Sequence, residues 1–341
     1  MHFNRAATLL FVVFFTVSKA ETFQDAIFMP GVRTYRDDSY LCRMKRVEDN
    51  ETFITSFQPE HDESVAHHMI LFACEEPGVH TDVWQCDDRE GGEPVCTGAQ
   101  TILFSWAMNA PGFTLPPGIS FPVGLHPYKY LVLQVHYKDA KTFSDNPDKY
   151  DTSGFILTVQ TEPTPRLAGI YLLAAVGEIG PNGWTVVRTA CRYTGYATLH
   201  PFAFRVHAHG HGVINKGYAY HDGERSLIGA QSPQRLQTYY PVEDKDVKIY
   251  PHDLISAMCN MTNHEDKVFK MGNTRGDEMC NFYMMYWVSH DDADQLTDPL
   301  NQDCAVDGDT AIREIAEEKA IDFANQMRKE SYKSFSDSRK E

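Results

Sequence analysis

Residues 130–137 read Tyr-Leu-Val-Leu-Gln-Val-His-Tyr, and this alternation is typical of a β-strand. Successive side chains of a strand point to opposite faces of the sheet. Leu131, Leu133 and Val135 therefore share one face, while Gln134 and His136 share the other. The stretch predicts a strand with a buried apolar face and a polar face that carries an imidazole. A lone histidine in such a place is most often structural, so its meaning depends on its neighbours.

Other short strands flank this one, and turns that contain proline and glycine separate them. Met69–Ala73 and Phe155–Gln160 are clear apolar runs, and Pro111-Gly112 and Asp145–Asp148 are among the breaks. A second strand-rich stretch covers about residues 168–308. Short strands at such intervals are typical of antiparallel sandwiches. The sequence predicts an all-β fold made of two antiparallel β-sandwich domains.

A stiff proline segment, Thr-Glu-Pro-Thr-Pro at residues 161–165, indicates the boundary between the two domains. We expect a first domain at residues 21–160, a linker at 161–167 and a second domain at 168–308. Residues 309–341 are highly charged, with apolar side chains at helical spacing. They predict a short C-terminal helical tail, and a solvated helix on the second domain or a frayed tail is favoured over a dedicated partner-binding helix.

Residues 1–20 have the features of a signal peptide. Arg5 precedes a short apolar run at Leu9–Val17, and Ser18-Lys19-Ala20 offers small residues for cleavage. The apolar run is shorter than the roughly 20 residues that a membrane-spanning helix needs. Cleavage is therefore favoured over an N-terminal anchor, and we expect no transmembrane anchor elsewhere. The predicted location is the lumen of the secretory pathway, such as a secretory granule, or the outside of the cell.

The net charge of −16, from 31 basic and 47 acidic residues, argues against a nucleic-acid partner. An acidic surface is typical of a soluble protein in a crowded lumen. We expect a monomer that binds no nucleic acid.

The chain has eight cysteines, and in a secreted protein an even number indicates disulfides. Four lie in the first half of the chain and four in the second, at Cys42, Cys74, Cys86, Cys96, Cys191, Cys259, Cys280 and Cys304. Pairing within each set is the simplest inference and suggests two separately stapled domains. Two N-glycosylation sequons, at Asn50 and Asn260, fit the same compartment.

Two histidine clusters and one methionine carry the predicted chemistry. His67-His68 opens a strand-like run, His207 and His209 lie in Arg-Val-His-Ala-His-Gly-His, and Met279 lies in Asp-Glu-Met-Cys-Asn-Phe-Tyr. Soft sulfur ligands select Cu(I), whereas zinc gains little from a thioether. In a secreted chain the combination predicts copper that cycles through Cu(I). Taken alone, Met279 would be core packing and the His-Ala-His pattern could be surface decoration.

Strand spacing puts Arg205, His207, His209 and His211 on one face. Two imidazoles two residues apart can converge on one metal, and His211 is a rival third ligand. The guanidinium of Arg205 is placed to meet an anion bound beside that metal.

The same spacing puts Met279, Asn281 and Tyr283 on one face, which indicates a ligand followed by two polar groups for a substrate. His67 and His68, as adjacent strand residues, should point to opposite faces. Both can bind one ion only if the backbone is bent, as bulges near sites permit, or if the two rings use different nitrogens.

These residues, in this order, resemble the peptidylglycine α-hydroxylating monooxygenases, the copper- and ascorbate-dependent hydroxylases of peptide amidation. The resemblance runs from about residue 26 to Cys304. The motifs are Ala-His-His-Met at 66–69, Leu-Gln-Val-His-Tyr at 133–137, Arg-Val-His-Ala-His at 205–209, Tyr-Pro-Val-Glu at 240–243 and Asp-Glu-Met-Cys-Asn-Phe-Tyr at 277–283. It implies two jelly-roll sandwiches, each with one copper, that face each other across a cleft.

The resemblance also implies roles for individual residues. The implied ligands are His67, His68 and His136 for the electron-transfer copper and His207, His209 and Met279 for the catalytic copper. Arg205, Asn281 and Tyr283 resemble the groups that hold the terminal carboxylate of the peptide, and Tyr40 and Gln134 match other residues of the cleft. The implied disulfides are Cys42–Cys86, Cys74–Cys96, Cys191–Cys304 and Cys259–Cys280. A fifth family disulfide has no cysteines here, and Gly210-His211 departs from the family pattern.

The implied activity is hydroxylation of the α-carbon of a C-terminal glycine, the first step of peptide amidation, with two copper ions, ascorbate and O2. Partners would be glycine-extended peptides and a separate amidating lyase, because nothing after residue 304 resembles the lyase domain. One rival is an enzyme like dopamine β-monooxygenase, which the carboxylate-binding set disfavours. Another is a secreted copper-binding protein without turnover, which would take up no oxygen with ascorbate.

Overall fold

A computed structural model of the chain describes residues 21–47, 51–62, 64–86, 92–107, 109–124, 127–272, 276–297 and 303–320. The predicted signal peptide, the sequon residue Asn50 and the tail beyond residue 320 lie outside the described residues.

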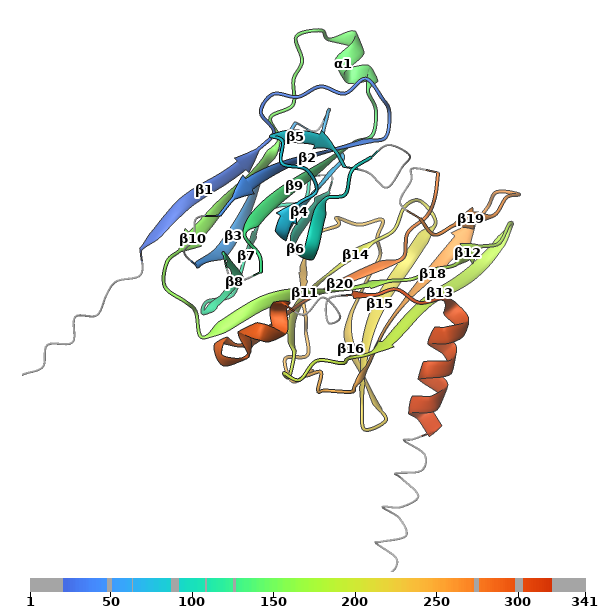
Figure 1. The fold of residues 1–341 in the computed structure, drawn as a ribbon. Coiled ribbons are helices and arrows are strands. Elements are labelled where there is room, and N and C mark those ends of the chain that lie inside the picture. Colours follow the sequence, from blue (N-terminus) through green and yellow to red (C-terminus); the bar gives the residue numbers. More distant parts are fainter. Residues whose placement is uncertain are drawn as a thin grey trace, which may run out of the picture.

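The first half of the chain forms a β-sandwich, drawn in blue to green in Figure 1. One sheet has the order β5 (Val83–Gln85), β2 (Ser39–Arg46), β9 (Tyr130–Tyr137), β4 (His68–Pro77) and β6 (Cys96–Ala107). The facing layer has the order β1 (Thr22–Phe28), β10 (Gly154–Gln160), β3 (Thr52–Glu60) and β8 (Ile119–Val123), with β7 (Phe113–Thr114) paired to β3. The stretch at 130–137 is the central strand β9, as its alternation predicts.

The second half forms another pair of layers, in yellow-green to orange in Figure 1. The outer sheet has the order β13 (Gly183–Arg192), β18 (Leu254–Asn263), β15 (Gly212–His221) and β16 (Glu224–Gln231). The inner layer has the order β11 (Arg166–Ala174), β20 (Asn281–Ser289), β14 (His200–His207) and β17 (Tyr240–Pro241). Short elements complete the described chain: α1 (Lys141–Asp145), η1 (His290–Thr297), the pair β12 (Glu178–Ile179) and β19 (Phe269–Lys270), and β21 (Asp303–Cys304).

The predicted all-β class with antiparallel sheets is confirmed, with two short exceptions. β8 pairs in parallel with β11, through Ile119 opposite Arg166, and β21 also pairs in parallel with β11. The first exception joins one layer of each sandwich into a single ten-stranded sheet. The linker keeps β11 beside β8, because the buried Thr164 hydroxyl bonds to Ser120 at 2.6 Å and to the carbonyl oxygen of Arg166 at 2.7 Å.

The inner layer of the second sandwich is buried on both faces. On β20, Phe282 and Met284 pack into the core of the second sandwich, while Tyr283 and Met285 pack into the core of the first. A strand buried on both sides is expected to be a continuous apolar run, as Phe-Tyr-Met-Met-Tyr-Trp-Val at residues 282–288 is. The first sandwich therefore packs directly on the strand face that carries Tyr283.

Each half of the chain contains two disulfides. They are Cys42–Cys86 and Cys74–Cys96 in the first half and Cys191–Cys304 and Cys259–Cys280 in the second. These are the pairs that the resemblance implies, and all eight cysteines are bonded. Cys259–Cys280 links β18 to the residue that follows Met279, so it anchors the start of β20.

The predicted C-terminal tail is helical over residues 308–320, the red helix of Figure 1. Ala311 is fully buried with Leu254 and Tyr220 of the outer sheet. Arg192 of β13 bonds to Glu318 of the helix at 3.0 Å. Among the described residues, no helix is long and apolar enough to cross a membrane.

Candidate functional site

Both sandwiches contribute side chains to one cavity of about 590 Å³. The first sandwich supplies Tyr40, His67, His68, Ala107, His136 and Lys138, and the second supplies His207 to Gly210, Pro233 to Gln237 and Met279. Lys138 and Arg235 are exposed at its edge. Among the residues that the structure describes, no carboxylate lines this cavity, although the chain as a whole is strongly acidic.

The first donor set is a triangle of imidazole nitrogens. The Nδ1 atoms of His67, His68 and His136 lie 3.3, 3.3 and 3.4 Å from one another. A triangle of side 3.3 Å has its centre about 1.9 Å from each corner, the side divided by √3. That is close to the distance of about 2.0–2.1 Å at which imidazole binds a metal such as zinc. The geometry therefore fits one metal ion bound by three Nδ1 atoms.

A bend in the chain brings the two adjacent histidines together. β4 begins at His68, and His67 lies in the bend before it, with its backbone N–H bonded to the carbonyl oxygen of His136 at 2.9 Å. The bulges of β4 lie at Leu71/Phe72 and further along, not at the histidine pair. Of the two arrangements that the sequence allowed, the structure has the bent backbone, and the two rings present the same nitrogen.

The third ring is held by residues of β2 and the turn before it. Asp38 accepts a hydrogen bond from Nε2 of His136 at 2.7 Å, so that nitrogen carries the proton and Nδ1 keeps a lone pair. The ring of Tyr40 stacks on the ring of His136, with centroids 4.2 Å apart. Asp38 has a left-handed backbone, φ 56°. A carboxylate on the far nitrogen of a ligating histidine fixes its tautomer and its orientation.

The rings of His67 and His68 are neutral at physiological pH. Burial, followed by the charge of His136, lowers the pKa of His67 to about 4. Burial also lowers the pKa of His68 well below 6.5. Neutral imidazole is the form that binds metals.

The second donor set begins with His207, the last residue of β14. The Gln237 amide nitrogen donates to the carbonyl oxygens of Ala208 and Pro233, at 3.2 and 3.0 Å. Its oxygen therefore accepts from Nδ1 of His207, at 2.5 Å, and leaves the lone pair of Nε2 for a metal. Burial, followed by the charge of Arg205, lowers the pKa of His207 to about 3, so this ring is also neutral.

His209 and Met279 complete the second set from outside the strands. Nδ1 of His209 donates to the carbonyl oxygen of Asp277 at 2.8 Å, which again leaves Nε2 for a metal. The rings of His207 and His209 lie 5.3 Å apart. Met279 lines the same cavity, and the amide of Asn281 contacts its sulfur at 3.8 Å. The structure thus brings the three predicted ligands together.

One prediction from strand spacing is wrong. β14 ends at His207, so His209 and His211 do not continue its face. The imidazole of His211 bonds to the fully buried Glu278 at 3.0 Å, packs on Phe269 and is not among the residues that line the cavity. The turn at residues 210–211 sends the chain back into β15, which removes His211 as a rival ligand.

The predicted carboxylate-binding residues Arg205, Asn281 and Tyr283 lie next to the second donor set on β14 and β20, behind the residues that line the cavity and not among them. Arg205 is opposite Tyr283 in the pairing of β14 with β20, and its guanidinium lies 5.1 Å from the centre of the Tyr283 ring. Its Nε donates to the carbonyl oxygen of Gln237 at 3.0 Å, and its two Nη groups have no hydrogen-bond partner among the described residues. Gln134 does not line the cavity. Its side-chain amide donates instead to the carbonyl oxygen of Cys86 at 3.3 Å.

Comparison with known families decides the ancestry of the chain. Residues 26–144 match the N-terminal domain, and residues 166–310 the C-terminal domain, of the copper type II ascorbate-dependent monooxygenases. The chain belongs to this family. The two donor sets fall one in each matched domain, and a set with two imidazoles and a thioether suits copper better than zinc.

Curated relatives within this monooxygenase family agree. The chain is 40% identical over 267 residues to peptidyl-glycine alpha-amidating monooxygenase A of Xenopus laevis, a match that covers 77% of this chain and 28% of that protein. The corresponding mouse protein is 40% identical over 267 residues, covering 77% of this chain and 26% of the relative. Human DBH-like monooxygenase protein 1 is 24% identical over 287 residues, covering 74% and 45%. The chain thus spans less than a third of the length of the amidating monooxygenases that it matches.

Several residues that shape this monooxygenase site were missed from the sequence. Asp38 and Gln237 bond to the rings of predicted ligands, and Glu278 accepts from the backbone N–H groups of two of them, but all three lie in turns and loops, where no periodic pattern marks them. Glu278 had one usable signal, since an acidic residue directly before a predicted ligand and a buried strand is unusual. Asp38 and Gln237 could not be found without the three-dimensional contacts.

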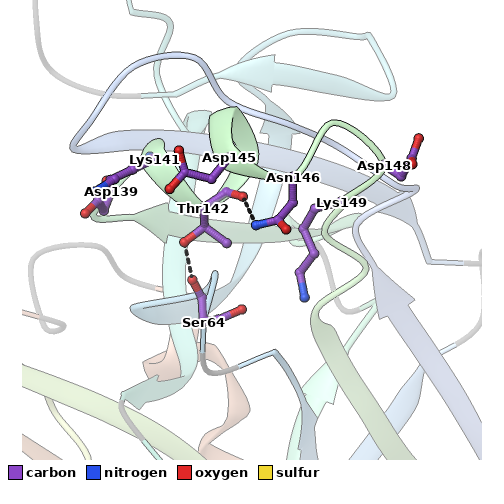
Figure 2. A pocket seen from close by; sticks show the side chains of 8 residues that line it. All are labelled: Ser64, Asp139, Lys141, Thr142, Asp145, Asn146, Asp148 and Lys149. Atoms are coloured by element: carbon purple, nitrogen blue, oxygen red, sulfur yellow. Dashed lines mark hydrogen bonds between the residues drawn. The ribbon is translucent and has the colours of Figure 1, made fainter.

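A second hollow, of about 610 Å³, lies around α1, away from both donor sets. Figure 2 shows its charged and polar side chains, including Asp139, Lys141 and Lys149, with Thr142 bonded to the carbonyl oxygen of Ser64. None of the described residues that line it is a histidine, cysteine or methionine. Its acidic and basic side chains alternate over an open surface, which does not fit a copper site.

Proposed function

We propose that this chain hydroxylates the α-carbon of the C-terminal glycine of peptides, using copper, ascorbate and O2, as the first step of peptide amidation. The observation that carries the proposal is the buried Arg205, two residues before His207 on β14, whose Nη groups have no hydrogen-bond partner among the described residues. A planar guanidinium binds a carboxylate through two parallel charge-assisted hydrogen bonds. The names of the frog and mouse relatives support the same activity.

We assign the electron-transfer copper to His67, His68 and His136 in a first domain at residues 21–160. The catalytic copper is assigned to His207, His209 and Met279 in a second domain at residues 168–308, with 161–167 as the linker. Bound copper supplies one-electron redox chemistry toward O2, with ascorbate as the electron donor. In the net reaction one oxygen atom enters the glycine C–H bond, and the other leaves as water after taking electrons from ascorbate.

The protein residues bind and orient the peptide. Arg205 takes the terminal carboxylate, the ring of Tyr283 supports the guanidinium, and Asn281 stands between this anchor and Met279. Anchoring the carboxylate sets the adjacent α-carbon beside the second donor set, where position lowers the barrier without an acid or base group. The basic edge formed by Lys138 and Arg235 attracts the peptide carboxylate, and Tyr40 lines the same cavity.

We further propose that the chain works as a monomer in the secretory lumen or outside the cell, and that a separate lyase cleaves its product. The four disulfides support an oxidising compartment. Asn260 supports N-glycosylation there, because its neighbours Cys259 and Met261 face the core and its own side chain faces the outer side of β18.

The test is to incubate the mature chain with copper, ascorbate, O2 and a glycine-extended peptide, and to follow product mass. We expect a gain of one oxygen atom on the terminal glycine that depends on ascorbate. Met279→His should keep copper bound and lose most hydroxylation, because imidazole favours Cu(I) less than a thioether does. Turnover of a catecholamine in place of the peptide would favour the dopamine β-monooxygenase-like alternative. Bound copper with no oxygen uptake would favour a copper-binding protein without turnover.

A further inference from the structure

Glu278 is a fully buried carboxylate directly before Met279, and neither Glu278 nor its partner His211 lines the cavity. A buried charge is costly unless it is paired and hydrogen-bonded. The chain therefore keeps a costly group at this position, and its contacts indicate what that group does.

Both oxygens of Glu278 accept hydrogen bonds from the segments that carry the second donor set. Oε1 accepts from the backbone N–H of His209 and from that of Met279, the latter at 2.7 Å. Oε2 accepts from the backbone N–H of His211 and from its Nδ1, both at 3.0 Å. One carboxylate thus joins two segments that are about seventy residues apart in sequence.

The two ligands joined in this way are the ones that lack a strand to hold them. His207 belongs to β14, but His209 follows that strand and Met279 precedes β20. Among the described residues, no other side chain bonds to the backbone N–H groups of both. The relative position of the imidazole of His209 and the thioether of Met279 is therefore set by the Glu278 carboxylate together with the hydrogen bond from Nδ1 of His209 to the carbonyl oxygen of Asp277.

His211 holds this carboxylate in place. Its ring packs on Phe269 of β19, with centroids 4.1 Å apart, and its backbone oxygen accepts from the N–H of Thr262 in β18 at 2.9 Å. The ring is therefore held against β19 and the backbone of His211 against β18 of the outer sheet, while Nδ1 donates to Oε2. Without that donor, Oε2 would keep only one backbone hydrogen bond, and the carboxylate could rotate and release Oε1 from His209 and Met279.

We propose that His211 and Glu278 form a positioning pair that sets the distance between His209 and Met279 at the second copper site. The inference rests on the copper assignment in the proposed function, and it gives His211 a role other than that of a ligand. Groups that orient metal ligands in this way are worth about 10- to 100-fold in metal affinity or activity.

The test compares three variants of the full mature chain. His211→Leu removes the donor and keeps an apolar side chain against Phe269. His211→Asn restores an N–H donor near the place of Nδ1. His221→Leu is the matched control, because Nδ1 of His221 also bonds to a carboxylate, that of Asp253 at 2.8 Å, but on the far end of β15.

Two readouts other than turnover follow the second site. The first is copper affinity from competition with a chelator, and the second is the Cu(I)–sulfur contribution to X-ray absorption, which only Met279 supplies in the assigned ligand sets. We expect His211→Leu to weaken binding of one of the two coppers by about 10- to 100-fold and to diminish the sulfur signal. His211→Asn should recover most of both, and His221→Leu should change neither.

Either of two results would overturn the proposal: an unchanged sulfur signal and affinity in His211→Leu, or an equal loss at both copper sites, which would indicate general destabilisation. The readouts also separate this inference from the proposed function. A chain that binds two coppers with a His211-dependent sulfur signal, yet hydroxylates no peptide, refutes the function and leaves the positioning pair intact.

Discussion

Replacing Arg205 by alanine tests the proposed recognition of the peptide carboxylate. Arg205 is only 3% exposed, and its Nη groups have no other hydrogen-bond partner among the described residues. A hydrogen bond to a charged group contributes about 1.5–3 kcal/mol. Two such bonds, reduced by the water that would enter the vacated space, give a loss of about 3 kcal/mol. Since about 1.4 kcal/mol is tenfold, kcat/KM should fall by about 100-fold.

The assay uses one peptide in two forms, with a free C-terminal glycine carboxylate and with that carboxylate converted to an amide. Arg205→Ala should lower kcat/KM about 100-fold for the free acid and only slightly for the amide. Arg205→Lys keeps the charge but loses the planar fork, so it should show an intermediate loss of about tenfold for the acid. If Arg205→Ala lowered turnover of both forms equally, the residue would support the fold through Tyr283 instead of binding the carboxylate. Thermal unfolding of each variant measures that contribution separately.

Three further outcomes follow from the structure. Asp38→Ala should weaken copper binding at the first donor set by about 10- to 100-fold while leaving the Cu(I)–sulfur signal intact, and a change in that signal would show that the two sites are not independent. Reversing the charges of Lys138 and Arg235 together should raise KM for peptides with a free C-terminal carboxylate at low salt. A KM that does not change with ionic strength would exclude electrostatic attraction of the peptide by these two residues. A hydrogen bond from Lys149 holds the pKa of Asp62 below its ordinary value of 3.8. The ionised carboxylate therefore stabilises the fold above about pH 4. This stabilisation is lost as the pH falls through the lower pKa of the folded state. Because the side chain is 41% exposed, chemical unfolding of Asp62→Asn should differ from wild type by less than about 1 kcal/mol at neutral pH, and the difference should vanish in acid.

Strand patterns carried most of the fold prediction. The alternation at residues 130–137 defines β9 to the residue, and the runs at 69–73 and 155–160 lie inside β4 and β10. The parallel joining of β8 to β11 could not be predicted, because it depends on a few hydrogen bonds of the linker and not on any repeating pattern.

The site was predictable where ligand chemistry is local and not where it depends on chain reversals. Soft sulfur with imidazole in an oxidising compartment indicates copper from residue types alone. The face assigned to His211 was wrong, because strand periodicity was extended past His207, where β14 ends and the chain turns. Strand ends are set by which backbone groups find partners, and here a distant carboxylate, Glu278, takes the N–H groups that a longer strand would use.

The two donor sets differ in which imidazole nitrogen faces the metal, and this difference suits the roles proposed for them. In the first set three Nδ1 atoms face one another, and Nδ1 lies next to the carbon that joins the ring to the main chain. A metal held by these three atoms would lie close to the backbone of the three histidines, at the wall of the shared cavity. In the second set Gln237 and the carbonyl of Asp277 take the Nδ1 protons, so the free Nε2 atoms of His207 and His209 project further from the backbone. These Nε2 atoms would hold a metal farther from the backbone, next to the strand that carries Arg205, where an anchored peptide could reach it, as hydroxylation requires and electron transfer does not.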